Sequence, residues 1–171
     1  MRGLIGFAAL LTLLFVHVDA AGAESQGEPP ILGPLGHARV VTPVVQSYDA
    51  QRLFADVNAA RAAHGLPTLT PDTRLDAFAL TVAQQMATRN YFGHTDPDGV
   101  TFDQRIRAAR IAFRFAAENM AFDQTEPHAN LMLLHSPGHY ANIMDPQARH
   151  LGVAAVGAGP DGVFYVEEFT N

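Results

Sequence analysis

The spacing of apolar residues predicts a first helix that begins between Tyr48 and Gln51. Its apolar stripe has members three or four positions apart: Leu53, Val57 and Ala60. Gly65 follows this run and is typical of the residue just after a helix C-terminus. His64 would then lie at the helix end, where an imidazole interacts favourably with the helix dipole.

A second helix is predicted directly after Thr70 and Pro71. Thr70 is a suitable N-cap, and proline suits the first helical position because the N–H it lacks would have no partner there. The apolar residues that follow again have helical spacing: Leu75, Ala79, Val82 and Met86. Gly93 then permits the turn that presents His94.

Two further helix starts are visible from capping patterns. Thr101 and Gln104 have the spacing of a capping box. Thr125, followed by Pro127, predicts another helix start. The apolar residues of this fourth helix lead to the SPGH sequence at 136–139: Leu131, Met132 and Leu134.

The pattern changes from helical spacing to strand composition at Leu151. Two segments, 151–157 and 162–169, are rich in valine and aromatic residues, and the Ala-Gly-Pro-Asp sequence between them is typical of a hairpin loop. Helices therefore come first along the chain and strands last. This order predicts an α+β fold with an antiparallel sheet.

The N-terminal residues divide into two segments that precede one domain. Residues 1–23 contain a basic Arg2, an apolar run and small residues at a cleavage point, which indicates a secretory signal peptide. The run is shorter than the ~20 residues of a spanning helix, so we expect cleavage and no remaining membrane span; an uncleaved anchor is the alternative. Residues 24–47 are rich in proline and glycine and read as a spacer, or as an arm packed along the domain at 48–171.

Composition excludes several classes of function. The 171-residue chain, 48% hydrophobic, is long enough for one core. It contains no cysteine, so disulfides and thiolate chemistry are excluded. Its net charge of −6 and its lack of a basic cluster argue against nucleic acid and anionic lipid as partners.

Three residues able to bind a metal or transfer protons lie beside turns or helix starts. They are His94 in FGHTDPDG, Glu118 in AAEN and His139 in SPGH. Ser136 and Pro137 would place His139 in the first turn of a helix. Two imidazoles and a carboxylate suit Zn²⁺ with an open fourth position. No local signature such as HExxH is present, so spacing alone does not bring these residues together.

The ordered set of segments resembles the CAP superfamily, also called the SCP or pathogenesis-related family 1 fold, in its bacterial extracellular branch. The resemblance begins near Val57 and covers roughly the last two thirds of the chain. It rests on VNAARAAHGLPTLT, LDAFALTVAQQMATRNYFGHTDPDG, RIRAAR, AAENMA, LLHSPGHYANIMDP and HLGVAAV. The absence of cysteine also points to the bacterial branch.

The resemblance implies a three-layer α-β-α sandwich with a central antiparallel sheet, and hence a third strand within or close to 113–120. It also implies a cleft lined by two histidines and two acidic residues. The matching positions are His94, Glu118 and His139, which are therefore the candidates for a Zn²⁺ site and for any catalysis. The fourth position does not match, because Ser136 stands about where the second acid would be, so we expect weaker metal binding.

Three interpretations of these residues remain open. They could form a hydrogen-bonded network without an ion, a cleft that binds a divalent metal or small ligand, or a metal-dependent hydrolase. Ser136 is better read as an N-cap than as a nucleophile, because no GxSxG elbow accompanies it. We expect a binding module that is secreted, periplasmic or part of the cell envelope. It is expected to be a monomer whose partner is a small ligand, a lipid or a protein. Metal-dependent hydrolysis is the alternative function.

Other polar residues are assigned supporting roles. Three histidines are interpreted as surface or capping residues: His64, His135 and His150. Strand alternation sends Glu167 and Glu168 to opposite faces, and we favour Glu167 as the one that supports the site. Asn119 either orients the site or satisfies a buried backbone group.

Overall fold

The computed structural model describes residues 42–171. The predicted signal peptide at 1–23 and most of the predicted linker at 24–47 lie outside these residues. The last linker residues are included, and Val44–Val45 already pair with the sheet of the domain. Every helix in residues 42–171 is too short or too polar to cross a membrane.

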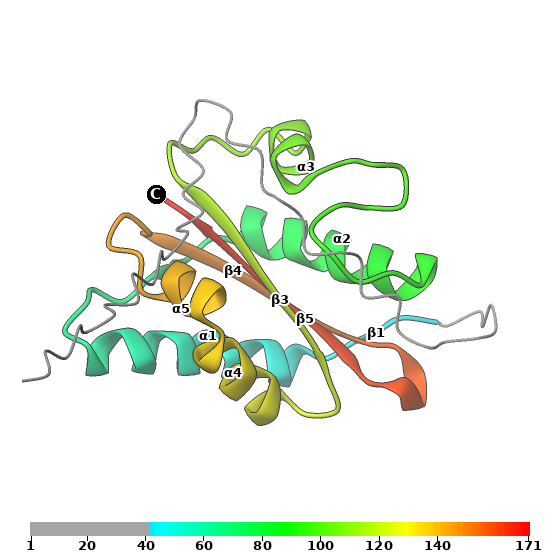
Figure 1. Ribbon diagram of the computed structural model, residues 1–171, viewed down its shortest axis with the longest axis horizontal. Helices are drawn as coiled ribbons and strands as arrows, with labels where there is room; N and C mark the ends of the chain where they lie inside the picture. The colour runs from blue at the N-terminus through cyan, green and yellow to red at the C-terminus, as the bar shows by residue number, and fades with distance from the viewer. Residues whose placement is uncertain (1–41) are drawn as a thin grey trace, which may run out of the picture.

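Helices cover both faces of one central sheet (Figure 1). One face carries α2 (Thr73–Arg89) and α3 (Phe102–Ala108). The other face carries α1 (Ser47–Ala63), α4 (Glu126–His135) and α5 (Pro137–Ile143). The predicted α+β sandwich of three layers is therefore confirmed.

The sheet contains three long strands and two short ones. The long strands are β3 (Ala116–Asp123), β4 (His150–Gly157) and β5 (Val163–Thr170), and the 3₁₀ turn Gly159–Asp161 joins β4 to β5. The strand order is β1-β4-β5-β3 with antiparallel pairing. β1 (Val44–Val45) and β2 (Thr70–Pro71) both lie on the outer edge of β4, β2 in parallel. The third strand expected near 113–120 is thus β3, at the opposite edge of the sheet.

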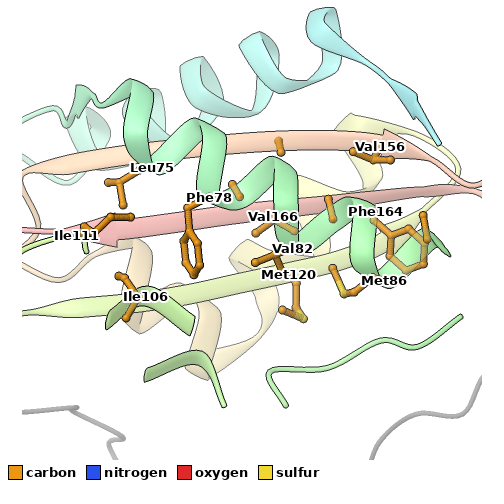
Figure 2. Close-up of a cluster of buried hydrophobic side chains, with 14 of the residues drawn as sticks. Leu75, Phe78, Val82, Met86, Ile106, Ile111, Met120, Val156, Phe164 and Val166 are labelled. Atoms are coloured by element: carbon orange, nitrogen blue, oxygen red, sulfur yellow. The ribbon is translucent and has the colours of Figure 1, made fainter. Parts of the chain in front are cut away.

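Strand alternation separates two hydrophobic cores. The core between the sheet and α2 contains Leu75, Phe78, Val82 and Met86 of that helix, with Met120, Phe164 and Val166 from the strands (Figure 2). The core under α1, α4 and α5 is formed by apolar residues of both the helices and the strands: Leu53, Val57, Leu133, Ile143, Leu151, Tyr165 and Phe169. Even-numbered residues of β3 and β5 therefore face α2 and α3, and odd-numbered residues face the other layer.

The predicted cap at Thr70 is wrong. The N-cap of α2 is Asp72, whose carboxylate accepts a hydrogen bond from the Arg74 N–H at 2.8 Å. Thr70 and Pro71 instead form β2, in which the Thr70 N–H donates to the Arg149 carbonyl at 2.9 Å. A residue before proline favours extended backbone, and here a neighbouring strand is available to pair with it.

The predicted starts of α3, α4 and α5 are confirmed, and α1 begins at Ser47, one residue before the predicted range. Thr101 and Gln104 form a capping box, with hydrogen bonds of 3.4 and 2.9 Å. Thr125 is the N-cap of α4, and Ser136 is the N-cap of α5, although neither side chain makes a capping hydrogen bond.

Candidate functional site

His94 and Glu118 form a hydrogen-bonded pair at the β3 edge of the sheet. His94 Nδ1 lies 2.8 Å from Glu118 Oε1, across 24 positions of sequence. The Glu118 side chain is 1% exposed, whereas that of His94 is 49% exposed. A carboxylate accepts the Nδ1 proton, so a neutral His94 carries its lone pair on Nε2, at the opposite side of the ring.

Arg105 holds both members of this pair. Its Nη2 donates to the two Glu118 oxygens at 3.0 and 2.9 Å, and its Nη1 donates to the His94 carbonyl at 2.9 Å. The Arg105 side chain is itself buried, because α3 carries it under the loop that contains His94. A charge-assisted contact to both carboxylate oxygens is strong and directional, so Glu118 is fixed in place.

Glu168 is the strand partner of Glu118 and lies on the same face. It is fully buried, and it can share a hydrogen bond with Glu118 only when one of the two carboxyl groups is protonated. Burial, and then the negative charge of Glu118, raise the pKa of Glu168 well above its usual range. Both causes favour the protonated form of Glu168 over the carboxylate, while Arg105 donates to the two oxygens of Glu118.

Asn119 occupies the other face of β3 and connects three segments. Its Nδ2 donates to Glu167 Oε2 at 2.9 Å and to the His139 carbonyl at 3.1 Å, and its Oδ1 accepts from Asn142 Nδ2 at 2.8 Å. Asn119 thus satisfies a buried backbone group and also anchors α5 to the sheet. Of the two roles proposed for it from sequence, the contact with a backbone group is observed, whereas its printed hydrogen bonds do not include His94 or Glu118.

The three predicted metal ligands are not brought together as one ligand set. His94 and Glu118 are in contact on the α3 side of β3, while α5, which carries His139, packs near Asn119 on the other side. No group of three or more His, Cys, Asp and Glu side chains in residues 42–171 is arranged to hold a metal ion. Both Glu118 oxygens already accept hydrogen bonds from Arg105.

Sequence reasoning selected the wrong member of the Glu167–Glu168 pair. Register places Glu168 opposite Glu118, and Glu167 beside Asn119 on the other face. Strand alternation shows that Glu167 and Glu168 face opposite sides of the sheet. Which of them lies on the Glu118 side depends on the register of β5 with β3, which local sequence does not determine. Arg105 was also missed, because a basic residue in a short amphipathic helix normally lies at the surface.

The three histidines assigned to surface or capping roles have those roles. His64 and His135 Nδ1 lie 2.9 and 2.8 Å from the carbonyls of Ala60 and Leu131, four residues earlier in their helices. His150 Nδ1 lies 2.8 Å from Thr70 Oγ1, where β2 meets β4.

Comparison with known proteins identifies the family. The family model described as CAP, cysteine-rich secretory protein family, matches residues 54–169. The chain belongs to the CAP family. This CAP chain is 30% identical over 142 residues to the protein YkwD of Bacillus subtilis (strain 168), which corresponds to 82% of this chain and 55% of YkwD. The predicted family and its bacterial branch are confirmed, although this member contains no cysteine.

Two solved structures share the CAP fold. An extracellular protein containing a SCP domain, from Bacillus anthracis str. Ames, has a TM-score of 0.64 and 30% identity over 74% of this chain and 41% of its own. NaASP2, whose crystal structure was determined with Zn²⁺, has a TM-score of 0.54 over 73% of this chain and 80% of its own. At 14% identity the second likeness concerns the fold alone.

This CAP chain spans about half the length of the curated relative it matches, 55% of YkwD. The activity of a longer protein does not transfer to one of its domains through fold. Function must therefore be argued from the His94 site itself.

Proposed function

We propose that this CAP protein is a secreted binding module and that His94 is its contact residue. The observation that carries the proposal is the half-exposed His94 imidazole held by the buried Glu118 carboxylate at 2.8 Å. A side chain fixed on one ring nitrogen presents the other in a defined direction, which reduces the ordering cost of binding.

The ligand is a small molecule, or a group of a partner, that donates a hydrogen bond to His94 Nε2. Orientation by Glu118 makes this nitrogen an acceptor when the ring is neutral. The donor set does not fit a three-ligand zinc site, because no group of three or more His, Cys, Asp and Glu side chains in the described part of the chain is arranged to hold an ion, and the Arg105 guanidinium already neutralises Glu118. A cation bound to His94 Nε2 would not be ligated by Glu118, because Glu118 hydrogen-bonds the other ring nitrogen, Nδ1.

Secretion is proposed from two sources. Residues 1–23 have the pattern of a signal peptide. The Bacillus anthracis protein with 30% identity is described as extracellular.

Metal-dependent hydrolysis is the weaker candidate. A general base needs a carboxylate or imidazole that is free to take a proton in the cleft. The oriented His94 imidazole is able to take a proton, but no group of three or more His, Cys, Asp and Glu side chains in residues 42–171 is arranged to hold the metal ion that such a hydrolase needs. Ser136 makes no capping hydrogen bond that would orient its hydroxyl. Binding therefore has more support than turnover.

A ligand-binding screen on the full chain tests the proposal. Fragments bearing amide and amine donors are added, and the imidazole ¹⁵N signals are followed by NMR. We expect hits to shift the His94 Nε2 signal, and their binding to disappear in His94→Ala. It should persist in His135→Ala, the matched control at an exposed helix end.

Two outcomes would contradict this assignment. One is a library without hits, and the other is a set of hits that bind His94→Ala as well as the wild type. Calorimetric titration with Zn²⁺ examines the three-residue metal site separately. We expect no binding step that needs both His94 and His139; tight stoichiometric binding that is lost in His94→Ala and in His139→Ala would restore the zinc site.

A further inference from the structure

The outer edge of β4, on the opposite side of the sheet from His94, carries one unpaired backbone acceptor. β1 and β2 pair with the two ends of this strand, and the hydrogen bonds that flank them end at the carbonyls of Ala155 and Leu151. Between these bonds, the Val153 N–H donates to Asp76 Oδ1 at 2.9 Å. The N–H and C=O of one strand residue point to the same side, so the Val153 carbonyl also faces outward, where no donor from residues 42–171 binds it.

The Asp76 carboxylate supplies a second free acceptor at the same place. Asp76 reaches the strand edge because α2 packs directly on β4, where a Cβ at Gly152 would lie 2.2 Å from the Leu75 backbone. Its Oδ1 accepts the strand N–H, whereas its Oδ2 has no hydrogen bond or ion pair within the described residues. Arg74, in the same helix, is already paired with Asp72 by bonds of 3.2 and 2.8 Å. A negative charge and two free acceptors therefore lie together at this edge.

These acceptors lie at the floor of an apolar groove of about 460 Å³. α1 contributes Ala50 and Phe54 to one wall, and α2 contributes Ala77 and Leu80 to the other. Asp76 is the one charged side chain in the lining within residues 42–171. A concave site with apolar walls and few polar groups is typical of small-ligand pockets, and the volume of this groove is in their range.

The polar groups of the groove favour a cationic ligand. An ammonium group has three donors and no acceptor. It can donate to the Val153 carbonyl and to Asp76 Oδ2 at once, and its charge is opposite to that of the carboxylate. A ligand with a carboxylate or phosphate group would be repelled by Asp76. An uncharged hydrocarbon would cover both acceptors without giving either of them a donor, which is unfavourable.

We propose that this groove binds a small amphiphilic primary amine. The ammonium group binds at Asp76 and the Val153 carbonyl, and the apolar body lies between Phe54 of α1 and Leu80 of α2. The pairing of β4 with β1 and β2 stays as it is, because the ligand needs no backbone partner beyond the free carbonyl. This site lies at the other edge of the sheet from His94, so amine binding here is independent of ligand binding there.

An NMR titration of the ¹⁵N-labelled full chain tests the proposal. The probes are n-octylammonium, octan-1-ol and octanoate, which share one chain length and differ in the head group. We expect saturable binding of octylammonium that shifts the amide signals of Val153 and Ala77. Octan-1-ol should bind at least about tenfold more weakly because it lacks the charge, and octanoate more weakly still.

Four variants locate the site, and thermal unfolding verifies that each is folded. Asp76→Asn keeps an acceptor for the Val153 N–H but removes the charge, so octylammonium should bind about tenfold more weakly, close to octan-1-ol. Ala77→Arg places a bulky cation in the groove and should weaken binding about tenfold or more. Ala59→Arg adds the same charge at an exposed position of α1 outside the lining, and should change binding less than about twofold. His94→Ala should leave it unchanged.

Several outcomes would overturn the proposal. One is the absence of saturable binding, and another is equal affinity for octylammonium and octan-1-ol. Equal weakening by Ala77→Arg and Ala59→Arg would mean that overall charge, rather than the groove, governs binding. Loss of binding in His94→Ala would place the amine at the His94 site instead. Binding that appears only in a chain that begins at residue 42 would make the preceding residues the occupant of the groove.

Discussion

Neighbouring carboxyl groups on β3 and β5 differ because their surroundings differ. Glu118 has a guanidinium at both oxygens, whereas Glu168 is buried opposite it and faces the Glu118 carboxyl group. Glu167, on the other face, accepts one hydrogen bond from Asn119. Burial raises the pKa of Glu167 to about 7, against the opposing effect of that hydrogen bond.

The raised pKa of Glu167 predicts a pH dependence of stability. The folded state binds this proton more tightly than the unfolded state, so the contribution of Glu167 to stability is fully present below the unfolded pKa of about 4.5 and is lost as the pH rises through about 7. Glu167→Gln keeps the acceptor for Asn119 and removes the ionisation. We expect this variant to be more stable than the wild type at pH 8 by roughly 1–3 kcal/mol, and nearly equal to it at pH 4.

Urea denaturation at a series of pH values measures the effect. Asp98→Asn is the control, because this carboxylate is 72% exposed and should leave the pH profile unchanged. A Glu167→Gln profile parallel to that of the wild type from pH 4 to pH 8 would show that another group carries the dependence.

At the scale of elements, one buried arginine joins the ends of two helices. Arg61, near the end of α1, is completely buried, and its Nη1 donates to the carbonyls of Ile143 and Asp145 at 2.7 and 3.0 Å. Its Nε donates to the Pro67 carbonyl at 2.9 Å. The carbonyl groups at the C-terminal end of α5 and in the loop after α1 therefore share one side chain as their hydrogen-bond donor.

Replacement of Arg61 should be strongly destabilising. Arg61→Met fills similar space but removes the donor from two buried carbonyls and one partly buried carbonyl, so we expect a loss of about 2–4 kcal/mol in the free energy of unfolding. Arg107→Met removes an exposed ion pair with Asp103 and should have no measurable effect. Chemical denaturation measures the free energy of unfolding of both variants. Equal values for the two would mean that water replaces the Arg61 contacts.

Element types and most helix starts could be predicted from local sequence. The capping box of α3 depends on two residues three positions apart, so sequence alone locates it. The start of α2 could not be placed in this way. Thr70–Pro71 satisfies a local rule for helix starts, but pairing with β4, some 80 positions away, turns it into a strand.

At the scale of the whole molecule, the two edges of the sheet differ. β3 forms the edge that carries the His94 site, whereas the outer edge of β4 is covered in pieces by β1 and β2. An exposed strand edge favours association with another chain. β1, just before α1, therefore protects the fold as well as extending the sheet.

Removal of β1 should reveal this protection. A chain that begins at residue 48 loses the β1 pairing and the bond from the Gln46 N–H to the Ala155 carbonyl. Compared with a chain that begins at residue 42, we expect unfolding free energy to fall by about 1–3 kcal/mol and concentration-dependent association to appear. Denaturation and sedimentation velocity measure the two effects. Identical behaviour of the two chains would show that β1 contributes neither stability nor edge protection.

The sequence by itself determined the family, the α+β class, most helix starts and the segments in which His94, Glu118 and His139 lie. These features depend on residues close in sequence, or on the order of short motifs. Only the tertiary structure decided which side chains meet. Strand register placed Glu168 rather than Glu167 opposite Glu118, α3 brought the buried Arg105 to that carboxylate, and the sheet separated Glu118 from the layer that carries His139. Register and layer position are set by packing across the whole chain, because a shift of one residue exchanges the faces of a strand.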